Sequence, residues 1–334
     1  MIIDTLRPPG RLDVTADAYK DWLHVNVFDH DSGCIGIFNT SLHGSPRDAR
    51  ARAIGTALMH APDTGWVGNV EVIAISQANI GPTSIGLEHV AIATDGPDAV
   101  LASAALPAAG LEARFTASAR SRPINVDYPL PFGAGWISWY VLPRLAVTGG
   151  MVVDGRRLDL TGATAYHDHN WGRWHWGDDV GWEWGACAAR DPEATFVVFV
   201  VSRATDRAHL NTTGALLIAD FAGERRCFGG GNLRIRLEGR FGGRLLRLPG
   251  ALAALHQDRI TPALPDRIHV RADDGIDALE IEIRVRAVAQ LIAADPVRRG
   301  YGFLHEMAGA FVASYRVGGC SRTADGLAIF EYVD

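Results

Sequence analysis

The chain has 334 residues, of which 48% are hydrophobic and 21% are charged, and its formal net charge is −6. This composition excludes a disordered chain and a strongly basic one, so we expect a folded protein without a nucleic-acid partner. The length suits two domains better than one. The longest uninterrupted apolar run, Phe196 to Val201, has the length of a strand rather than of a membrane helix.

The predicted strands begin with a hairpin, in which Trp22 to Asp29 and Cys34 to Asn39 flank an Asp-Ser-Gly turn. Leu279, Ile281, Ile283 and Val285 alternate with charged residues, which predicts a strand with one solvated face. The other runs rich in β-branched residues are, in chain order, Val67–Ser76, Ile85–Ala93, Ala99–Leu106, Leu111–Ala117, Trp136–Leu142, Leu145–Val153, Thr195–Ser202, Ala215–Asp220, Asn232–Leu237, Arg267–Ala272, Ala278–Ala289, Gly309–Val317 and Leu327–Tyr332.

Two segments have helical composition. Pro46 to His60 is rich in Ala, Arg and Leu and has Ser45 as an N-cap candidate, and Leu248 to Gln257 is the second. Many short strands with few short helices predict an all-β fold of two tandem β-barrel or sandwich domains. We place the domains at residues 1–170 and 171–334.

The four cysteines, at positions 34, 187, 227 and 320, form no C-x-x-C pair and match no zinc-site spacing. No phosphate-binding loop, dinucleotide-binding motif or nucleophile elbow is present either. Met1 to Gly10 contains no apolar core of a signal peptide. We therefore expect free thiols, a cytoplasmic location, and neither a metal nor a cofactor. Access to a membrane-resident substrate would require peripheral association, for which Pro46 to His60 is the candidate segment.

Tryptophan is concentrated in one part of the chain. Seven of the nine tryptophans lie between Trp136 and Trp184, and the densest group begins in the segment Tyr166-His-Asp-His-Asn-Trp-Gly172. In an extended strand, Tyr166, Asp168 and Asn170 share one face, while His167, His169 and Trp171 share the other. The sequence thus predicts a carboxyl group surrounded by aromatic side chains.

This arrangement has three interpretations. Burial among aromatic side chains raises the pKa of a carboxyl group, so Asp168 would act as a general acid. The ring faces of Tyr and Trp would then stabilise the carbocation that forms when Asp168 protonates the substrate. The tryptophans could instead fill a β-barrel core. In the third interpretation, His167 and His169 share a strand face and ligate a metal ion, although a complete ligand set is missing.

The run Gly162 to Gly172 resembles the carotenoid 1,2-hydratase (hydroxyneurosporene synthase) family, within a lipocalin-like group that includes AttH-like proteins and fungal Diels–Alderases. Trp136 to Tyr140 and Val152 to Gly155 support the resemblance. It implies two lipocalin-like domains with an apolar pocket. It also implies that Asp168 protonates an isoprenoid double bond, and that Tyr166 and Trp139 stabilise the cation.

The resemblance and the local pattern together define the candidate site. Asp168 and Tyr166 are the candidate catalytic residues, and the candidate substrate-binding residues are Trp136, Trp139, His169, Asn170, Trp171, Trp174, Trp176, Trp182 and Trp184. The predicted function is acid-initiated hydration or cyclisation of an apolar isoprenoid or polyene. A pericyclase that folds a linear polyene and a lipocalin-like lipid-binding protein are the alternatives, and all three imply a hydrophobic small-molecule ligand.

Overall fold

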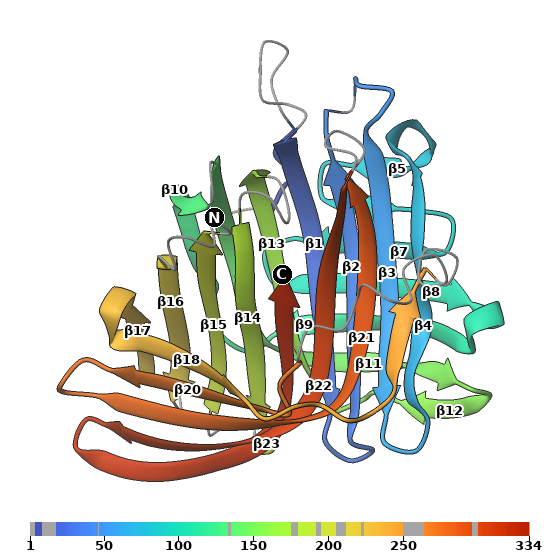
Figure 1. Ribbon diagram of the computed structural model, residues 1–334. Helices are drawn as coiled ribbons and strands as arrows, with labels where there is room; N and C mark the ends of the chain where they lie inside the picture. The colour runs from blue at the N-terminus through green and yellow to red at the C-terminus, as the bar shows by residue number, and fades with distance from the viewer. Residues whose placement is uncertain are drawn as a thin grey trace. The chain divides into compact units, whose positions relative to one another are not determined.

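A computed structural model shows an all-β chain (Figure 1). The structure describes residues 4–8, 18–45, 47–132, 135–174, 180–191, 195–204, 212–221, 224–249, 264–295 and 300–333. The chain divides into two compact units, Met1–His175 with Asp295–Gly300, and Trp176–Ala294 with Tyr301–Asp334. The predicted boundary between residues 170 and 171 falls inside a strand, Thr164–Arg173, and the two units separate just after that strand.

The first unit is built on one antiparallel sheet. Its described strands run in the order β4-β3-β2-β1-β13-β11-β9-β8-β7-β6-β5, and β10 and β12 both pair with β11. Their bounds are β1 Tyr19–Asp29, β2 Cys34–His43, β3 Arg52–Ala61, β4 Gly65–Ala74, β5 Asn79–Gly81, β6 Ser84–Gly86, β7 Val90–Asp95, β8 Ala99–Leu106, β9 Leu111–Ala119, β10 Ile124–Phe132, β11 Gly135–Val153, β12 Arg156–Asp159 and β13 Thr164–Arg173.

This sheet curls so that distant strands share one core. Val25 on β1, Phe38 on β2 and Phe115 on β9 belong to the same buried cluster, and the rings of Phe38 and Phe115 meet edge to face at 5.0 Å. Along β1 the core residues alternate with Trp22, His24 and other side chains on the opposite face. Both faces of β1 are buried, which is unusual for an antiparallel strand.

The second unit contains a further sheet, in the order β17-β16-β15-β14-β23-β22-β21-β20-β18 within the described residues. A short strand, β19, pairs in parallel with β21. The bounds are β14 Val180–Ala189, β15 Thr195–Ala204, β16 Thr212–Phe221, β17 Glu224–Gly229, β18 Leu233–Glu238, β19 Leu245–Leu248, β20 Arg267–Asp273, β21 Ala278–Asp295, β22 Gly300–Val317 and β23 Cys320–Val333. One face of this sheet carries its apolar core, which includes Met307, Phe311 and Phe330.

Most of the predicted strands are present, and the hairpin between β1 and β2 is confirmed. In its turn, the Asp29 carboxylate accepts hydrogen bonds from the Asp31 N–H at 3.2 Å and from the Ser32 hydroxyl. The two strands predicted on either side of Pro143 form one long strand, β11. Its pairing with β13 shifts between Leu142 and Leu145, where Pro143 offers no N–H to the ladder.

The helix predicted from Pro46 to His60 is wrong. Residues 47–50 form turns and β3 begins at Arg52. Because β3 is buried on both faces, it lacks the alternation that marks a strand, and its Ala-rich composition resembles that of a helix. Of the second predicted helix, Leu248 ends β19 and residues 250–257 lie outside the described residues.

Within the described ranges the helical segments are three-residue 3₁₀ turns, at Ile75–Gln77, Pro107–Ala109 and Gly230–Asn232. No helix in this part of the chain is long and apolar enough to cross a membrane.

Candidate functional site

The motif strand β13 lies in the middle of the first sheet, between β1 and β11. Asp168 stands opposite His24 on β1 and Val141 on β11. Gly172 permits this close pairing, because a Cβ atom at that position would lie 2.1 Å from the carbonyl oxygen of Trp136. The backbone of β11 thus lies so close to β13 at this position that only glycine fits there.

Both oxygens of the buried Asp168 carboxyl group are hydrogen-bonded by residues of the same strand. The Tyr166 hydroxyl donates to Oδ2 at 2.6 Å, and the Asn170 amide Nδ2 donates to Oδ1 at 2.6 Å. Only 3% of Asp168 and none of Tyr166 is exposed. The alternation of β13 thus brings the two predicted catalytic residues and Asn170 into direct contact.

The neighbouring histidine on β1 is neutral and has a defined tautomer. Asn39 Nδ2 lies 3.3 Å from Nδ1 of His24, and His24 Nε2 lies 3.0 Å from Oδ1 of Asn26. An amide nitrogen can only donate, so Nδ1 accepts and Nε2 carries the hydrogen. Burial lowers the pKa of His24. The polar groups placed around Asp168 on this face are therefore uncharged.

Nε1 of Trp139 and Nδ2 of Asn26 are buried hydrogen-bond donors on this face that have no partner among the described residues. Trp139 stands opposite Asn170 on β11, and Asn26 stands opposite Tyr166 on β1. Both are therefore diagonal neighbours of Asp168, one on each side. A buried donor without an acceptor is costly, so these two groups are suited to bind an oxygen atom of a ligand.

An aromatic cluster continues the face beyond Asn170. The ring of Trp174 meets Trp22 edge to face at 5.1 Å and Phe132 at 5.2 Å. The ammonium group of Lys20 donates to the Trp174 carbonyl oxygen at 3.1 Å and lies 5.9 Å from its ring centroid. Trp174 was predicted from the sequence, whereas Trp22 and Phe132 were not.

The opposite face of β13 holds a separate charged network around His169. Its Nε2 lies 2.7 Å from Oδ1 of Asp21, and its Nδ1 contacts Oδ1 of Asp4. Asp21 also accepts hydrogen bonds from the Tyr19 hydroxyl and, at 2.7 Å, from the backbone N–H of Arg7. Burial alone would lower the pKa of His169, but the two carboxylates outweigh it and raise the pKa to about 10. His169 is therefore a buried imidazolium ion.

His167 links the same network to the backbone of β1. Its Nδ1 donates to the His24 carbonyl oxygen at 2.8 Å, and its Nε2 lies 3.0 Å from Oδ2 of Asp4. Burial favours protonation of Asp4, but its hydrogen bonds to both histidines prevail and hold the pKa of this carboxyl group well below its ordinary value. The N-terminal residues 4–8 are thereby attached to the first unit.

The structure separates the predicted substrate-binding residues. His169 and Trp171 lie on the charged face of β13, where their rings are 4.8 Å apart and Arg7 lies 5.1 Å from the Trp171 ring. Trp136 packs on the same side, under the guanidinium group of Arg173 at 5.3 Å. Trp139, Asn170 and Trp174 lie on the Asp168 face. The buried Trp182 and Trp184 belong to β14 of the second unit, and Trp176 lies outside the described residues.

Sequence reasoning missed His24, Asn26, Asp4 and Asp21. None of them has a motif around it, and each joins the network only through strand pairing or through the N-terminal segment. No group of three potential ligands in the described part of the chain could hold a metal ion. The ring nitrogens of His167 and His169 are instead hydrogen-bonded to oxygen atoms.

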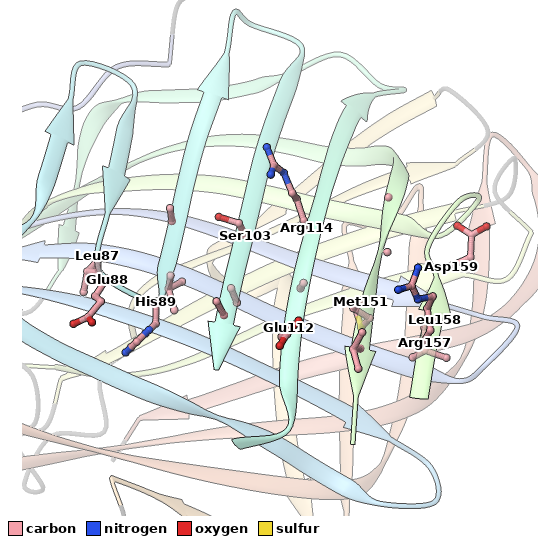
Figure 2. Close-up of a pocket in the computed structure, with 18 residues that line it drawn as sticks. Leu87, Glu88, His89, Ser103, Glu112, Arg114, Met151, Arg157, Leu158 and Asp159 are labelled. Atoms are coloured by element: carbon pink, nitrogen blue, oxygen red, sulfur yellow. The ribbon is translucent and has the colours of Figure 1, made fainter. Parts of the chain in front are cut away.

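A surface hollow of about 760 Å³ lies on β7–β9, β11 and β12 of the first unit (Figure 2). Ser103 and Arg114, which stand opposite each other on β8 and β9, both line it. None of the predicted site residues lines it.

The sequence matches no protein-family model and no curated protein. Solved structures match it in fold. An AttH-like protein from Nitrosomonas europaea has a TM-score of 0.69 at 14% identity, with 98% of each chain covered. Kievitone hydratase from Nectria haematococca has a TM-score of 0.64 at 13% identity, covering 94% of this chain and 88% of that one. CghA, also solved with Sch210972, has a TM-score of 0.59 at 12% identity, covering 95% and 88%.

These similarities establish the fold. The chain has the tandem lipocalin-like β architecture of the AttH-like structure, which confirms the predicted fold class apart from its helices. The identities are too low to transfer an activity.

Proposed function

We propose that this protein is an enzyme that adds water to a carbon–carbon double bond of an apolar substrate, with Asp168 as the acid. The observation that carries the proposal is the buried carboxyl group of Asp168 between Tyr166 and Asn170, with the unpartnered donors of Trp139 and Asn26 on the same face. Kievitone hydratase shares the fold, which supports a hydratase or cyclase type of enzyme on a hydrophobic substrate.

The proposed mechanism requires a proton on one oxygen of Asp168, and the hydrogen bonds favour Oδ2 for that role. The Asn170 amide nitrogen can only donate, so Oδ1 remains an acceptor. The Tyr166 hydroxyl can donate or accept, so it can turn to accept a hydrogen bond from a protonated Oδ2. Oδ2 is therefore the oxygen that can hold a proton without losing its partner.

In the proposed reaction, the O–H bond at Oδ2 breaks and the π electrons of the substrate form a C–H bond. The rings of Tyr166 and Trp139 stabilise the cation, each by about 0.5–2 kcal/mol. A water molecule held by the unpartnered donors adds to the cation and returns a proton to Asp168, which restores the acid. Capture of the cation by a second double bond of the substrate would give cyclisation instead.

The test is to incubate wild type and Asp168→Asn with a panel of linear terpenoids in deuterated water. The introduced asparagine can keep both hydrogen bonds if its amide nitrogen faces Tyr166, so the substitution removes the proton and preserves the network. We expect carbon-bound deuterium in the wild-type product and none in the variant. Asp159→Asn, at an exposed carboxylate of the same unit that accepts from the Thr161 N–H, is the matched control.

Product masses separate the possibilities. A gain of one water with carbon-bound deuterium supports hydration, and an isomeric product with deuterium supports cyclisation. Conversion without deuterium, unchanged in Asp168→Asn, would refute the acid mechanism in favour of a pericyclase. Binding of the panel compounds without conversion would support a lipid-binding protein.

A further inference from the structure

The surface hollow on β7–β9, β11 and β12 is a cavity that the proposed reaction does not use. Its volume of about 760 Å³ is in the range of small-molecule sites, and the residues of the Asp168 site do not line it. Ala91, Ala105 and Gly150 are among the lining residues and have small side chains or none. The hollow therefore has room for a ligand beside the backbone of the sheet.

Two rows of lining residues cross the strands of this hollow. In one row, Arg114 on β9 stands opposite Ser103 on β8 and Gly150 on β11. In the next row, Glu112 on β9 stands opposite Ala105 on β8. Residues that are directly opposite in an antiparallel pair share a face of the sheet. Arg114 and Glu112 therefore project beside positions that leave space around them.

These two charged side chains do not pair with each other. They lie two residues apart on β9, and Figure 2 shows them pointing in different directions. The same spacing gives ion pairs on β18, β20 and β21, at Arg236–Glu238, Arg271–Asp273 and Arg284–Glu282, with distances of 2.6, 3.2 and 2.8 Å. Within the described ranges, Arg114 and Glu112 have neither an ion pair nor a side-chain hydrogen bond. Both charges can therefore be neutralised by a ligand.

One wall of the hollow is fixed by hydrogen bonds of its backbone. The N–H groups of Glu88 and His89 each donate to the carboxylate of Glu71 at 3.1 Å. The carbonyl oxygen of His89 accepts from the N–H of Ala105 at 2.8 Å. The wall is thus formed before a ligand binds, so binding does not have to order this segment.

The charges of the hollow select the class of ligand. The Arg114 guanidinium can hold a carboxylate through two hydrogen bonds, and the neighbouring Ser103 hydroxyl can donate a third. The Glu112 carboxylate can hold an ammonium group. The other charged residues that line the hollow are likewise of both signs: Glu88, Arg157 and Asp159. A ligand with a single charge would therefore meet a like charge in the hollow, whereas a zwitterion can pair with both.

The spacing along β9 gives the length of that zwitterion. A strand rises about 3.4 Å per residue, so the Cα atoms of Glu112 and Arg114 are about 7 Å apart, and their diverging side chains add to the separation of the charges. An extended tripeptide is at most about 11 Å long. Its two terminal charges therefore suit this pair, whereas those of a single amino acid are too close together.

We propose that this hollow binds a small zwitterion of the length of a short peptide, with its carboxylate on Arg114 and Ser103 and its ammonium group on Glu112. The ligand lies beside Ala105 and Gly150, where the sheet presents little side chain. The inference does not depend on the role of Asp168.

Triglycine is the probe, and a titration followed by amide chemical shifts in the NMR spectrum of the full chain gives both affinity and location. We expect a millimolar dissociation constant, because exposed ion pairs each contribute little, and the largest shifts at Ser103, Glu112 and Arg114. N-acetyl-triglycine lacks the ammonium group and triglycine amide lacks the carboxylate. Each should bind about fivefold more weakly than triglycine.

The variants assign each charge to its partner. Arg114→Gln should bind triglycine about fivefold more weakly and lose the preference for triglycine over its amide, and Glu112→Gln should lose the preference over the N-acetyl form. Both positions are exposed on β9, so the fold is retained. Arg234→Gln on β18 and Glu280→Gln on β21, at exposed positions of the second unit, are the controls and should bind as wild type does.

A further variant tests the cavity without a change of charge. Ala105→Leu fills the hollow from an exposed strand position and should abolish binding. Equal affinity for triglycine and both blocked forms, or undiminished binding by Ala105→Leu, would overturn the proposal, as would the absence of shifts at these amides in the millimolar range. None of these measurements involves turnover, so failure here is distinguishable from failure of the Asp168 mechanism.

Discussion

The buried charge network on β13 leads to a quantitative prediction for Asp4→Asn. Asparagine has nearly the same shape as aspartate and can keep the contact of its oxygen with His169, so the substitution removes the carboxylate charge with little change in packing. The rise in the His169 pKa from 6.5 to about 10 corresponds to roughly 5 kcal/mol, which Asp4 and Asp21 share. We expect Asp4→Asn to lower the free energy of opening of the first unit by about 2–3 kcal/mol at neutral pH.

The pH dependence of this loss follows from the signs of the two shifts. The pKa of His169 is raised on folding, so its contribution is complete below the ordinary histidine value and disappears as the pH rises through about 10. The pKa of Asp4 is depressed, so its contribution is present above the ordinary carboxyl value and disappears in acid. The difference between wild type and variant should therefore have its full value between about pH 5 and 6.5, decline as the pH rises toward about 10, and decline in acid.

Hydrogen exchange measured by mass spectrometry provides the assay, because peptides from β1 and β13 report on the first unit separately from the second. Asp48→Asn is the control, since Asp48 pairs with Arg50 at the exposed surface and its loss should change the free energy very little. A loss below about 1 kcal/mol at neutral pH, or one that persists undiminished above pH 10, would refute the assignment of His169 as a buried cation.

Two further predictions concern stability. Gly172→Ala would place a Cβ atom 2.1 Å from the backbone oxygen of Trp136, so we expect a loss of at least about 2 kcal/mol in chemical denaturation, whereas Gly231→Ala, with no atom within 4 Å, should be neutral. Because burial raises the pKa of Glu306 from 4.5 to about 7, wild type should lose up to about 3 kcal/mol as the pH rises across that interval. Glu306→Gln should lack this loss and unfold at a higher temperature than wild type at pH 8; parallel pH profiles would contradict the reasoning.

The predictable part of the fold was the part with local signals. The turn after Asp29 and the alternation from Leu279 to Val285 mark β1, β2 and β21 correctly, because turn chemistry and a half-solvated strand both leave a pattern in the sequence. β3 left no such pattern, since burial on both faces removes the alternation and its alanines suit a helix equally well.

In the candidate site, too, only the contacts within a single strand could be predicted from the sequence. The contact of Asp168 with Tyr166 and Asn170 follows from the two-residue period of one strand, so a single stretch of sequence was sufficient. The partners His24 and Asn26 come from β1, more than a hundred residues earlier, and only the register of strand pairing brings them there. That register depends on the packing of the whole sheet and is not visible in either segment alone.

The motif on β13 therefore has two roles, which its alternation separates. Tyr166, Asp168 and Asn170 form the candidate reaction site, whereas His167 and His169 on the other face bind the N-terminal segment through Asp4. A sequence match to the motif consequently reports on the stability of the lipocalin-like unit as much as on catalysis. Substitutions on the His169 face should act through protein stability, and substitutions on the Asp168 face should change turnover of a protein that remains folded. Measuring both quantities for each variant is what distinguishes an enzyme from a binding protein that keeps the motif for its fold.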